Sequence, residues 1–560
     1  MRSLLALPPE TIDQICDCLA SDDLPSVYNF ALTDKQCLAI ANRHRFAQIH
    51  FTLVGRDRLE RDIQRWNEIL ENSSAFLSVR SVTVRGALLP IDEQMNHVPG
   101  SLTINQEENE GDLSCLGSYY RRDIDEFFTS FPNPQYDMWS SLQSLVCRLS
   151  CLRDMTWSCV ALFPPCLLET LQQSIPHCRL HVMAFKLLSL CYNNNRPIDI
   201  DQYEYQLATS PSLSSILVPV SQIDYVTNFN AKAAIELAKG LAPNLSRVHI
   251  VKESTGIRSN PAEAGDLEWR GFFQNGKVEN RLHRGNLQSL SLSSVSIDYF
   301  TAWQEQNAFS TLRVLQLWDV SENVLTAAAS CHMPLLKSLT LSFPGWKAYD
   351  EAASVLVSSL RPLEAIRLSS GRKERTFQAA IRHHGKSLTM LSLLPRESDL
   401  YEVIPSFTSW ITEIRLNCTN IRSLQLSVHR RTLKQEGSLF RAIGSISHLT
   451  NLSLRLICDN DVEEQESLLN ALDYPNSEPE LSRVALQNSA LHSSLLAQAI
   501  FFTVAQESSL QRLTLAIRCT LYPKRVAGFL NWSCCRWRCL RASENRIIVR
   551  ELEKDENCSG

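Results

Sequence analysis

The sequence lacks any long apolar run. No stretch approaches the roughly 18 apolar residues that would span a bilayer. The amino terminus has only Leu4 to Leu7 before two prolines, which is too short for the apolar core of a signal peptide. We therefore expect no membrane partner and a cytoplasmic or nuclear location.

A strong excess of either charge is also missing. The formal net charge is −5 over 560 residues, which gives neither a basic field for nucleic acid nor a strongly acidic tail. The chain is 44% hydrophobic and 21% charged, as is typical of folded proteins. We expect no nucleic-acid partner, and a chain of this length could hold several ordinary domains or one extended repeat array.

Paired cysteine motifs are absent although the chain has 18 cysteines. No two cysteines have the CxxC spacing of zinc sites. Several cysteines lie between Cys147 and Cys191 at irregular spacing, near His177 and His181. We expect reduced thiols that fill the core, and no metal site.

Catalytic motifs are equally scarce, since HExxH and GxSxG do not occur. Gly385-Lys386-Ser387 is half of a phosphate loop, but Ala380 stands where the first glycine should be. We interpret His383 and His384 as a solvated turn between repeats. The sequence thus predicts no catalytic residue, no cofactor and no enzyme, with an unrecognised enzyme such as a cysteine–histidine hydrolase as an alternative.

Three short helices are predicted within the first 40 residues. Pro9 suits a first helical turn, and Thr33 with Gln36 fits a capping box that opens the third helix. Apolar residues follow at helical spacing: Ile12, Ile15, Cys16 and Leu19, then Leu24, Val27 and Phe30, then Cys37, Leu38 and Ile40. Three such helices are too few to bury their apolar faces alone, so we expect a partner on them.

This stretch resembles the F-box, the helical module that docks SCF-type ubiquitin ligase subunits onto a Skp-type adaptor. The resemblance rests on Leu7-Pro8, Glu10, Ile12, Ile15, Leu19, Asp23-Leu24 and the segment from Leu32 to Leu38. Cys37 departs from the family, which usually has an aromatic residue near this point. The resemblance implies a Skp-type adaptor and, through it, a cullin as partners, with much of the adaptor-binding face formed by Leu7, Pro8, Ile12, Ile15, Leu19 and Leu24. The alternative is a small helical cap on whatever follows.

Four regions are expected along the chain. Residues 1–50 form the F-box-like helical module, and residues 51–141 form a connecting helix/strand region. That region contains a helix from Leu59 to Leu70, a short strand at Val79 to Val84 and a polar insertion from Gln94 to Gly117. Residues 142–520 are repetitive, and residues 521–560 form a C-terminal tail or cap, where cysteine, tryptophan and arginine cluster.

The repeated unit is the pattern LxxLxL. Strict matches begin at Leu287, Leu312, Leu336, Leu388, Leu449 and Leu510, and looser ones at Leu142, Ile175, Leu213, Leu245, Leu363, Ile421 and Leu481. From Leu287 to Leu388 the matches recur 24 to 27 residues apart, inside the period of leucine-rich repeats. The last two aliphatics of each match should point inward from a short strand, with an outer helix closing each coil.

The repeats resemble the divergent leucine-rich arrays found behind F-boxes in many fungal proteins. This resemblance implies an α/β fold in which the three-helix F-box-like module is followed by an irregular leucine-rich-repeat solenoid (horseshoe). Its usual asparagine or cysteine after the third aliphatic is missing, for example at Val295 and Val320. Residues Val251 to Asn286 are expected to form an insertion.

The expected function follows from these two resemblances. The chain would be a non-catalytic substrate receptor of an SCF-type ubiquitin ligase, with an unknown protein substrate bound by the repeats. Strand positions that flank the inward aliphatics should face the substrate, and those with distinctive side chains are Val314, Gln316, Trp318, Arg367, Met390 and Leu394. The alternative is a leucine-rich-repeat interaction scaffold unconnected to ubiquitin.

Overall fold

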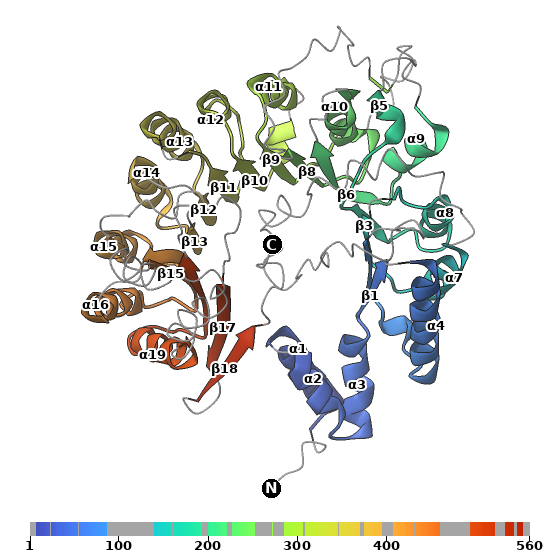
Figure 1. The fold of residues 1–560 in the computed structure, drawn as a ribbon, viewed down its shortest axis with the longest axis horizontal. Coiled ribbons are helices and arrows are strands. Elements are labelled where there is room, and N and C mark those ends of the chain that lie inside the picture. Colours follow the sequence, from blue (N-terminus) through green and yellow to red (C-terminus); the bar gives the residue numbers. More distant parts are fainter. Residues whose placement is uncertain are drawn as a thin grey trace, which may run out of the picture. The chain divides into compact units, whose positions relative to one another are not determined.

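A computed structural model gives the fold of the chain (Figure 1). It describes residues 7–22, 24–53, 55–86, 139–159, 161–192, 200–220, 227–252, 271–272, 285–305, 308–344, 346–369, 374–394, 407–429, 433–459, 493–520, 533–541 and 546–552. The chain divides into two compact units. The first comprises Met1–Leu292 with Glu305–Ala308, and the second comprises Ser293–Gln304 with Phe309–Gly560. Both units are mixed α/β.

The first unit begins with three helices, α1 (Pro9–Asp22), α2 (Leu24–Ala31) and α3 (Lys35–Arg45). Pro9 opens α1, as expected for a residue without a backbone N–H. The predicted capping box at Thr33 is wrong by one residue. Asp34 is the N-cap of α3, and its carboxylate accepts a hydrogen bond from the Gln36 backbone N–H at 2.8 Å, whereas the Thr33 hydroxyl donates to the Phe30 carbonyl at 2.7 Å.

The strands of the first unit pair in parallel in the order β1-β2-β3-β4-β6-β8-β9. They are β1 (Gln48–Leu53), β2 (Ser81–Gly86), β3 (Asp154–Cys159), β4 (Arg179–Val182), β6 (Leu213–Val220), β8 (Arg247–Lys252) and β9 (Ser289–Ser293). Helices alternate with them: α4 (Arg56–Asn72), α7 (Ser140–Arg148), α8 (Pro165–Gln173), α9 (Gln202–Ala208) and α10 (Asn230–Glu236). A separate small pair joins β5 (Cys191–Tyr192) to β7 (Thr227–Asn228) in antiparallel fashion.

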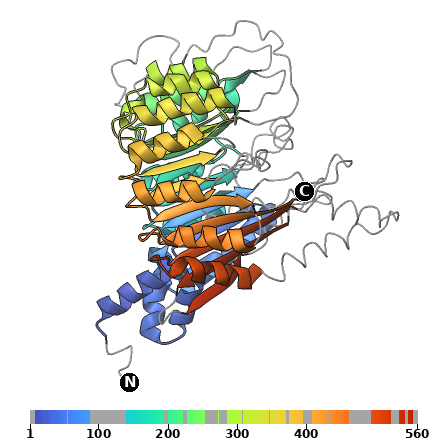
Figure 2. The same cartoon turned by 90° about the vertical axis from the view of Figure 1, so that its left-hand side faces the viewer.

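The second unit repeats the same alternation. Its parallel strands are β10 (Val314–Trp318), β11 (Ser338–Ser342), β12 (Ala365–Ser369), β13 (Met390–Leu393), β14 (Ser423–His429), β15 (Asn451–Asp459) and β16 (Arg512–Thr520). The helices are α11 (Ile297–Glu305), α12 (Glu322–Ala329), α13 (Lys347–Ser359), α14 (Glu374–His384), α15 (Phe407–Asn417), α16 (Leu433–Gly444) and α19 (Ser493–Ala505). Figure 2 shows α12 to α16 stacked along one side of their strands. The opposite side of the strands in either unit is called its helix-free face below.

Alternating leucines explain why each strand forms and which way it faces. In β11, for example, Leu339 and Leu341 are fully buried toward the helices, while Ser338 and Thr340 point to the helix-free face. Packing the leucine side of each strand against the helices stabilises the fold, because each leucine side chain removed from water contributes about 1.5–3 kcal/mol. Gly86 ends β2 with φ +116°, and a Cβ there would lie 2.4 Å from the Leu53 carbonyl oxygen, so this close approach of β1 and β2 requires glycine.

Every strict LxxLxL match lies on a strand, as predicted. The looser matches at Ile175, Leu213, Leu245, Leu363 and Ile421 also lie on strands. The match at Leu142 is wrong, because residues Ser140–Arg148 form helix α7 with Leu142, Leu145 and Val146 buried. Parallel pairing also begins at Gln48, well before residue 142. Helix α4 confirms the predicted helix from Leu59 to Leu70. The match at Leu481, the polar insertion and most of Val251 to Asn286 lie outside the described residues.

At the C-terminal end the strand direction reverses. Strand β17 (Ser533–Arg541) pairs antiparallel with β16, and β18 (Ile547–Leu552) pairs antiparallel with β17. Cys539 is fully buried. The described part of the predicted tail or cap therefore adds two antiparallel strands to the sheet that contains β16. Within the described residues no helix is both long and apolar enough to cross a membrane.

Candidate protein-interaction surfaces

The three N-terminal helices close a hydrophobic core of their own. Its members come from all three helices and are at most 6% exposed: Ile12, Cys16, Val27, Phe30, Ala31, Cys37 and Ala41. Cys37, which departs from the F-box pattern, fills part of this core. The expectation that three short helices cannot bury their apolar faces is therefore wrong for these side chains, which pack against one another.

This core changes the predicted adaptor-binding face. Ile12 is fully buried inside the module, so its assignment to the face is wrong: the stripe on α1 packs against α2 and α3. Ile15 and Leu19 are half-buried and pack against the edge of the same core. Leu24 begins α2, and its side chain lies outside the described residues.

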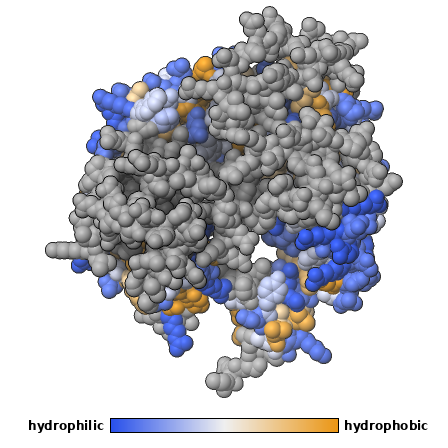
Figure 3. Space-filling model, viewed as in Figure 1, coloured by the Kyte–Doolittle hydropathy of each residue, from blue (hydrophilic) through white to orange (hydrophobic). Residues whose placement is uncertain are grey.

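Large apolar side chains nevertheless lie on the surface of the module. Leu7 and Pro8 are exposed before α1. Tyr28 in α2 and Leu38 in α3 are also exposed, and Leu32, in the turn between these two helices, is 85% exposed. Figure 3 shows apolar surface over the α2–α3 part of the molecule. A module whose core is closed and whose α2–α3 turn exposes Leu32 is suited to contact another protein.

Polar contacts join α1 to α3. Arg43 pairs with Asp13 at 2.8 Å and also with Asp17, which lies 2.9 Å from His44 Nε2. Desolvation opposes ionisation, but the hydrogen bonds from Arg43 and His44 lower the pKa of Asp17. These exposed pairs fix the angle between the two helices more than they add stability.

In the second unit, strand register places the predicted substrate-binding residues on the helix-free face. Gln316 is aligned with Thr340, and Thr340 with Arg367. Trp318 is aligned with Ser342, two residues further along each strand. Register and alternation thus put Gln316, Trp318 and Arg367 on the side opposite the buried leucines, and their role as substrate contacts stays a prediction.

Their exposure differs from expectation. Arg367 is only 9% exposed and Gln316 only 4%, so treating Arg367 as an exposed contact residue is wrong. Each of these side chains has neighbours on strands about 4.8 Å away on both sides, which crowd it. The other four predicted residues, Val314, Trp318, Met390 and Leu394, are half-buried.

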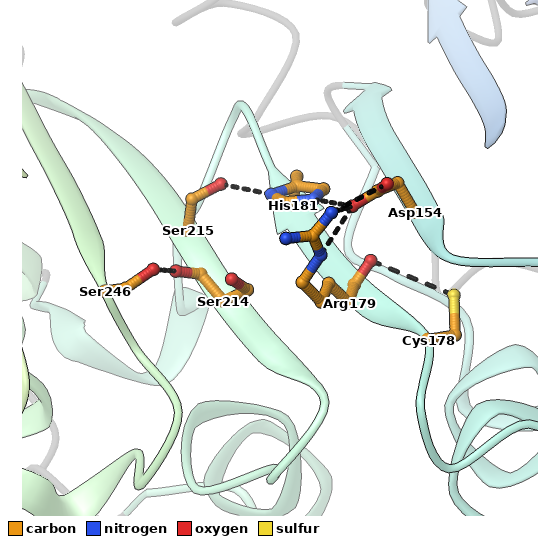
Figure 4. Close-up of polar contacts among 7 residues, drawn as sticks. All are labelled: Asp154, Cys178, Arg179, His181, Ser214, Ser215 and Ser246. Atoms are coloured by element: carbon orange, nitrogen blue, oxygen red, sulfur yellow. Dashed lines mark hydrogen bonds and ion pairs between the residues drawn. The ribbon is translucent and has the colours of Figure 1, made fainter. Parts of the chain in front are cut away.

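A charged cluster occupies the helix-free face of the first unit, and sequence reasoning did not identify it (Figure 4). Asp154 on β3 accepts two hydrogen bonds from Arg179 on β4, from Nε at 2.8 Å and from Nη2 at 3.0 Å. His181 on β4 lies with Nε2 2.9 Å from Asp154 Oδ1 and with Nδ1 2.7 Å from the Ser215 hydroxyl on β6. The cluster therefore bridges three adjacent parallel strands.

The protonation states follow from these contacts. An ionised Asp154 only accepts hydrogen bonds, so His181 Nε2 carries the proton and Nδ1 accepts from Ser215. Burial would raise the pKa of Asp154, but the hydrogen bonds from Arg179 and His181 lower it. Burial also lowers the pKa of His181, against the pull of Asp154.

Serine, histidine and aspartate in hydrogen-bond reach resemble a nucleophile, its base and the group that orients the base. Two features argue against that use. Ser215 is 2% exposed, and Asp154 is already neutralised by the Arg179 fork, which weakens its support of an imidazolium. We interpret the cluster as a rigid polar surface that holds Arg179 in place.

Strand register explains why the cluster was missed. Asp154 and His181 are 27 residues apart in sequence, and nothing in either strand specifies that they meet. The usable signal was alternation: Arg179 and His181 alternate with the buried Leu180 and Val182, so both had to share one face.

The predicted solvated turn at His383-His384 is wrong. Both residues lie in α14, and His384 is fully buried. Its Nδ1 accepts a hydrogen bond from the Leu363 backbone N–H at 3.2 Å, and its Nε2 lies 2.9 Å from the Val357 carbonyl oxygen. Gly385 is required next, because a Cβ there would lie 2.4 Å from the Ile381 carbonyl oxygen.

The cysteines show mixed environments. Cys159 and Cys178 are buried, as expected for core fillers, and burial raises the pKa of the Cys178 thiol to about 12. Cys147 is exposed instead. Among the described residues there is no group of three or more histidine, cysteine or acidic side chains placed to hold a metal ion.

Comparison with known proteins adds no identification. The chain matches no protein-family model, and a search of curated proteins gives no significant match.

Proposed function

We propose that this chain is a non-catalytic substrate-receptor subunit of an SCF-type ubiquitin ligase. Helices α1 to α3 bind a Skp-type adaptor, and through it a cullin, while the strand faces bind a protein substrate. The observation that carries the proposal is Leu32, which is 85% exposed on a module whose own core is closed. A leucine held in water on a rigid support favours a partner that covers it.

Energetics support a leucine contact at this turn. Burying a leucine side chain contributes about 1.5–3 kcal/mol, so Leu32 and Leu38 together supply a useful part of a micromolar interaction, which needs about 8 kcal/mol. The exposed Leu7 and Pro8 precede α1 and are available to add to this face. Because the core beneath is already packed, little ordering cost accompanies binding.

The repeating part of each unit fits the same proposal. We propose that each strand–helix pair is one coil of an irregular leucine-rich-repeat solenoid of the horseshoe type. Parallel register and buried alternating leucines, seen in both units, support this assignment. Such an array keeps its core residues fixed while the positions on the helix-free face vary, which is how substrate choice arises.

A second candidate is an interaction scaffold unconnected to ubiquitin, in which α1 to α3 only cap the array. One observation favours it: α3 ends at Arg45 and β1 begins at Gln48, with the buried Phe46 between them. The module is thus directly continuous with the first strand. The two candidates differ in whether an adaptor binds.

Purified Skp-type adaptor distinguishes them through single substitutions. Leu32→Asp and Leu38→Asp place charges on exposed positions, so the chain stays folded while adaptor affinity falls by well over tenfold. Leu416→Asp, on a leucine of α15 that is 65% exposed, between Leu38 at 38% and Leu32 at 85%, is the control and leaves affinity unchanged. If the two module variants bind as well as the control, the adaptor does not use this face and the proposal fails.

A further inference from the structure

Positive charge predominates on the helix-free face of the first unit. Its strand positions include three arginines, Arg85 on β2, Arg179 on β4 and Arg247 on β8, and one carboxylate, Asp154. Asp154 is occupied by Arg179 and His181. Arg247 is exposed, and no carboxylate among the described residues pairs with it. Among the described residues, the strand positions of this face therefore carry more positive than negative charge, although the whole chain is net negative.

Strand register sets the spacing of these cations. His181, Ser215 and Arg247 lie side by side on β4, β6 and β8, and Arg179 lies two residues before His181 on the same strand. Adjacent strands are about 4.8 Å apart, so Arg247 is about 10 Å from the strand that carries Arg179. An extended peptide rises about 3.3 Å per residue, so two acidic residues three or four positions apart match this separation.

The pKa values of two neighbouring histidines, His181 and His249, are influenced by these arginines. Burial lowers the pKa of His181, Asp154 opposes that shift, and the charges of Arg179 and Arg247 add to it. Burial lowers the pKa of His249 to about 4, with a further contribution from Arg247. Both rings therefore stay neutral at pH 7, and the arginines supply the charge of this face.

We propose that the helix-free face of the first unit binds an acidic peptide segment, with Arg247 and Arg179 receiving its carboxylates. This rests on the proposed function, since it names the substrate class of the strand faces. Arg247 takes one carboxylate, and Arg179 takes the second through the part of its guanidinium that Asp154 leaves unused. Asp154 holds the Arg179 fork in position and so reduces the entropy lost when the peptide binds.

The chemistry favours a peptide over nucleic acid. Nucleic-acid sites use many phosphate contacts and a strongly basic surface. Here the described strand positions of the face carry only three arginines, and one of them is paired with Asp154, in a chain of net charge −5.

Fluorescence anisotropy on the full chain tests the proposal with a short labelled peptide that carries glutamate at alternate positions. We expect saturable binding that weakens with salt, and none to the matching glutamine peptide. Arg247→Gln and Arg179→Gln should each weaken binding about tenfold, and Arg247→Lys should lose less. Arg65→Gln on the outer helix α4 removes the same charge from an exposed site and serves as the control, with no change.

Three results would overturn the inference: no binding of the glutamate peptide to the unaltered chain, equal losses for Arg65→Gln and Arg247→Gln, or equal affinity for a single-stranded DNA of similar charge that depends on the same arginines. The experiment contains no adaptor, so its outcome is separate from that of the adaptor titration. Arg247→Gln should leave adaptor binding unchanged, which keeps the two failures distinguishable.

Discussion

The two units have cores of the same kind and differ on their helix-free faces. In both, leucine and its aliphatic relatives fill most of the inward strand positions, as Leu180 and Leu339 illustrate. On the other side, the first unit presents an ion-pair cluster around Asp154. The second presents serine, threonine and glutamine together with Trp318, Arg367, Arg455 and Arg512. Inward positions are constrained by packing, while outward positions of the same strand are not, so chemistry can differ between units without changing the fold.

The largest expected effect tests the shared core. Leu180→Ala on β4 and Leu339→Ala on β11 remove the same side chain from fully buried positions. Each should destabilise its own unit by about 2–5 kcal/mol because a cavity forms. Hydrogen exchange of strand amides in the two units measures both costs, and a negligible loss in either unit would show that the cores are not equivalent.

Acid sensitivity gives the next effect, since the described residues of each unit include one buried histidine. Burial lowers the pKa of both His249 and His384 to about 4. Between this value and the unfolded value near 6.5, the unfolded chain binds more protons, so stability is full above pH 6.5 and is lost as the pH falls toward 4, by up to about 3 kcal/mol per histidine.

The two histidines should respond differently to replacement at pH 7. Both nitrogens of His384 have backbone partners, so His384→Leu should destabilise the second unit by about 2–3 kcal/mol. His249 Nδ1 is buried without a hydrogen-bond partner among the described residues, so His249→Leu should cost under about 1 kcal/mol. Both variants should also flatten the acid-induced loss in their own unit, as urea titrations at several pH values would reveal. Equal costs at pH 7 would contradict the assigned contacts.

The smallest expected effect is the difference in stability between substitutions on the two helix-free faces. Asp154→Asn removes a partly exposed partner of Arg179 and His181, and should cost about 1 kcal/mol. Ser423→Ala, at a half-buried outward position of β14, should change stability by less than about 0.5 kcal/mol. Thermal denaturation of both variants is sufficient, and a larger loss for Ser423→Ala would reverse the comparison.

The repeats could be predicted because spacing alone determines them. Strict LxxLxL matches lie on strands since the last two leucines share one face. The looser match at Leu142 failed because a helix also places residues three apart on one face, and α7 buries Leu142, Leu145 and Val146 in that way. Short apolar segments therefore do not distinguish the two periods.

The interaction surfaces were harder to predict from sequence. The apolar stripe on α1 shows which side of the helix is buried, but it does not show whether the covering surface belongs to the same chain. Ile12 was assigned to a partner for that reason, although α2 and α3 cover it. The cluster around Asp154 depends on register between strands far apart in sequence, and such register is set by the packing of the whole sheet.

The most direct test of the central claim is a calorimetric titration of purified Skp-type adaptor into the full chain. The account predicts a complex of one adaptor per chain that is lost in Leu32→Asp and kept in Leu416→Asp. Absence of any binding to the unaltered chain would contradict the assignment to a ubiquitin ligase.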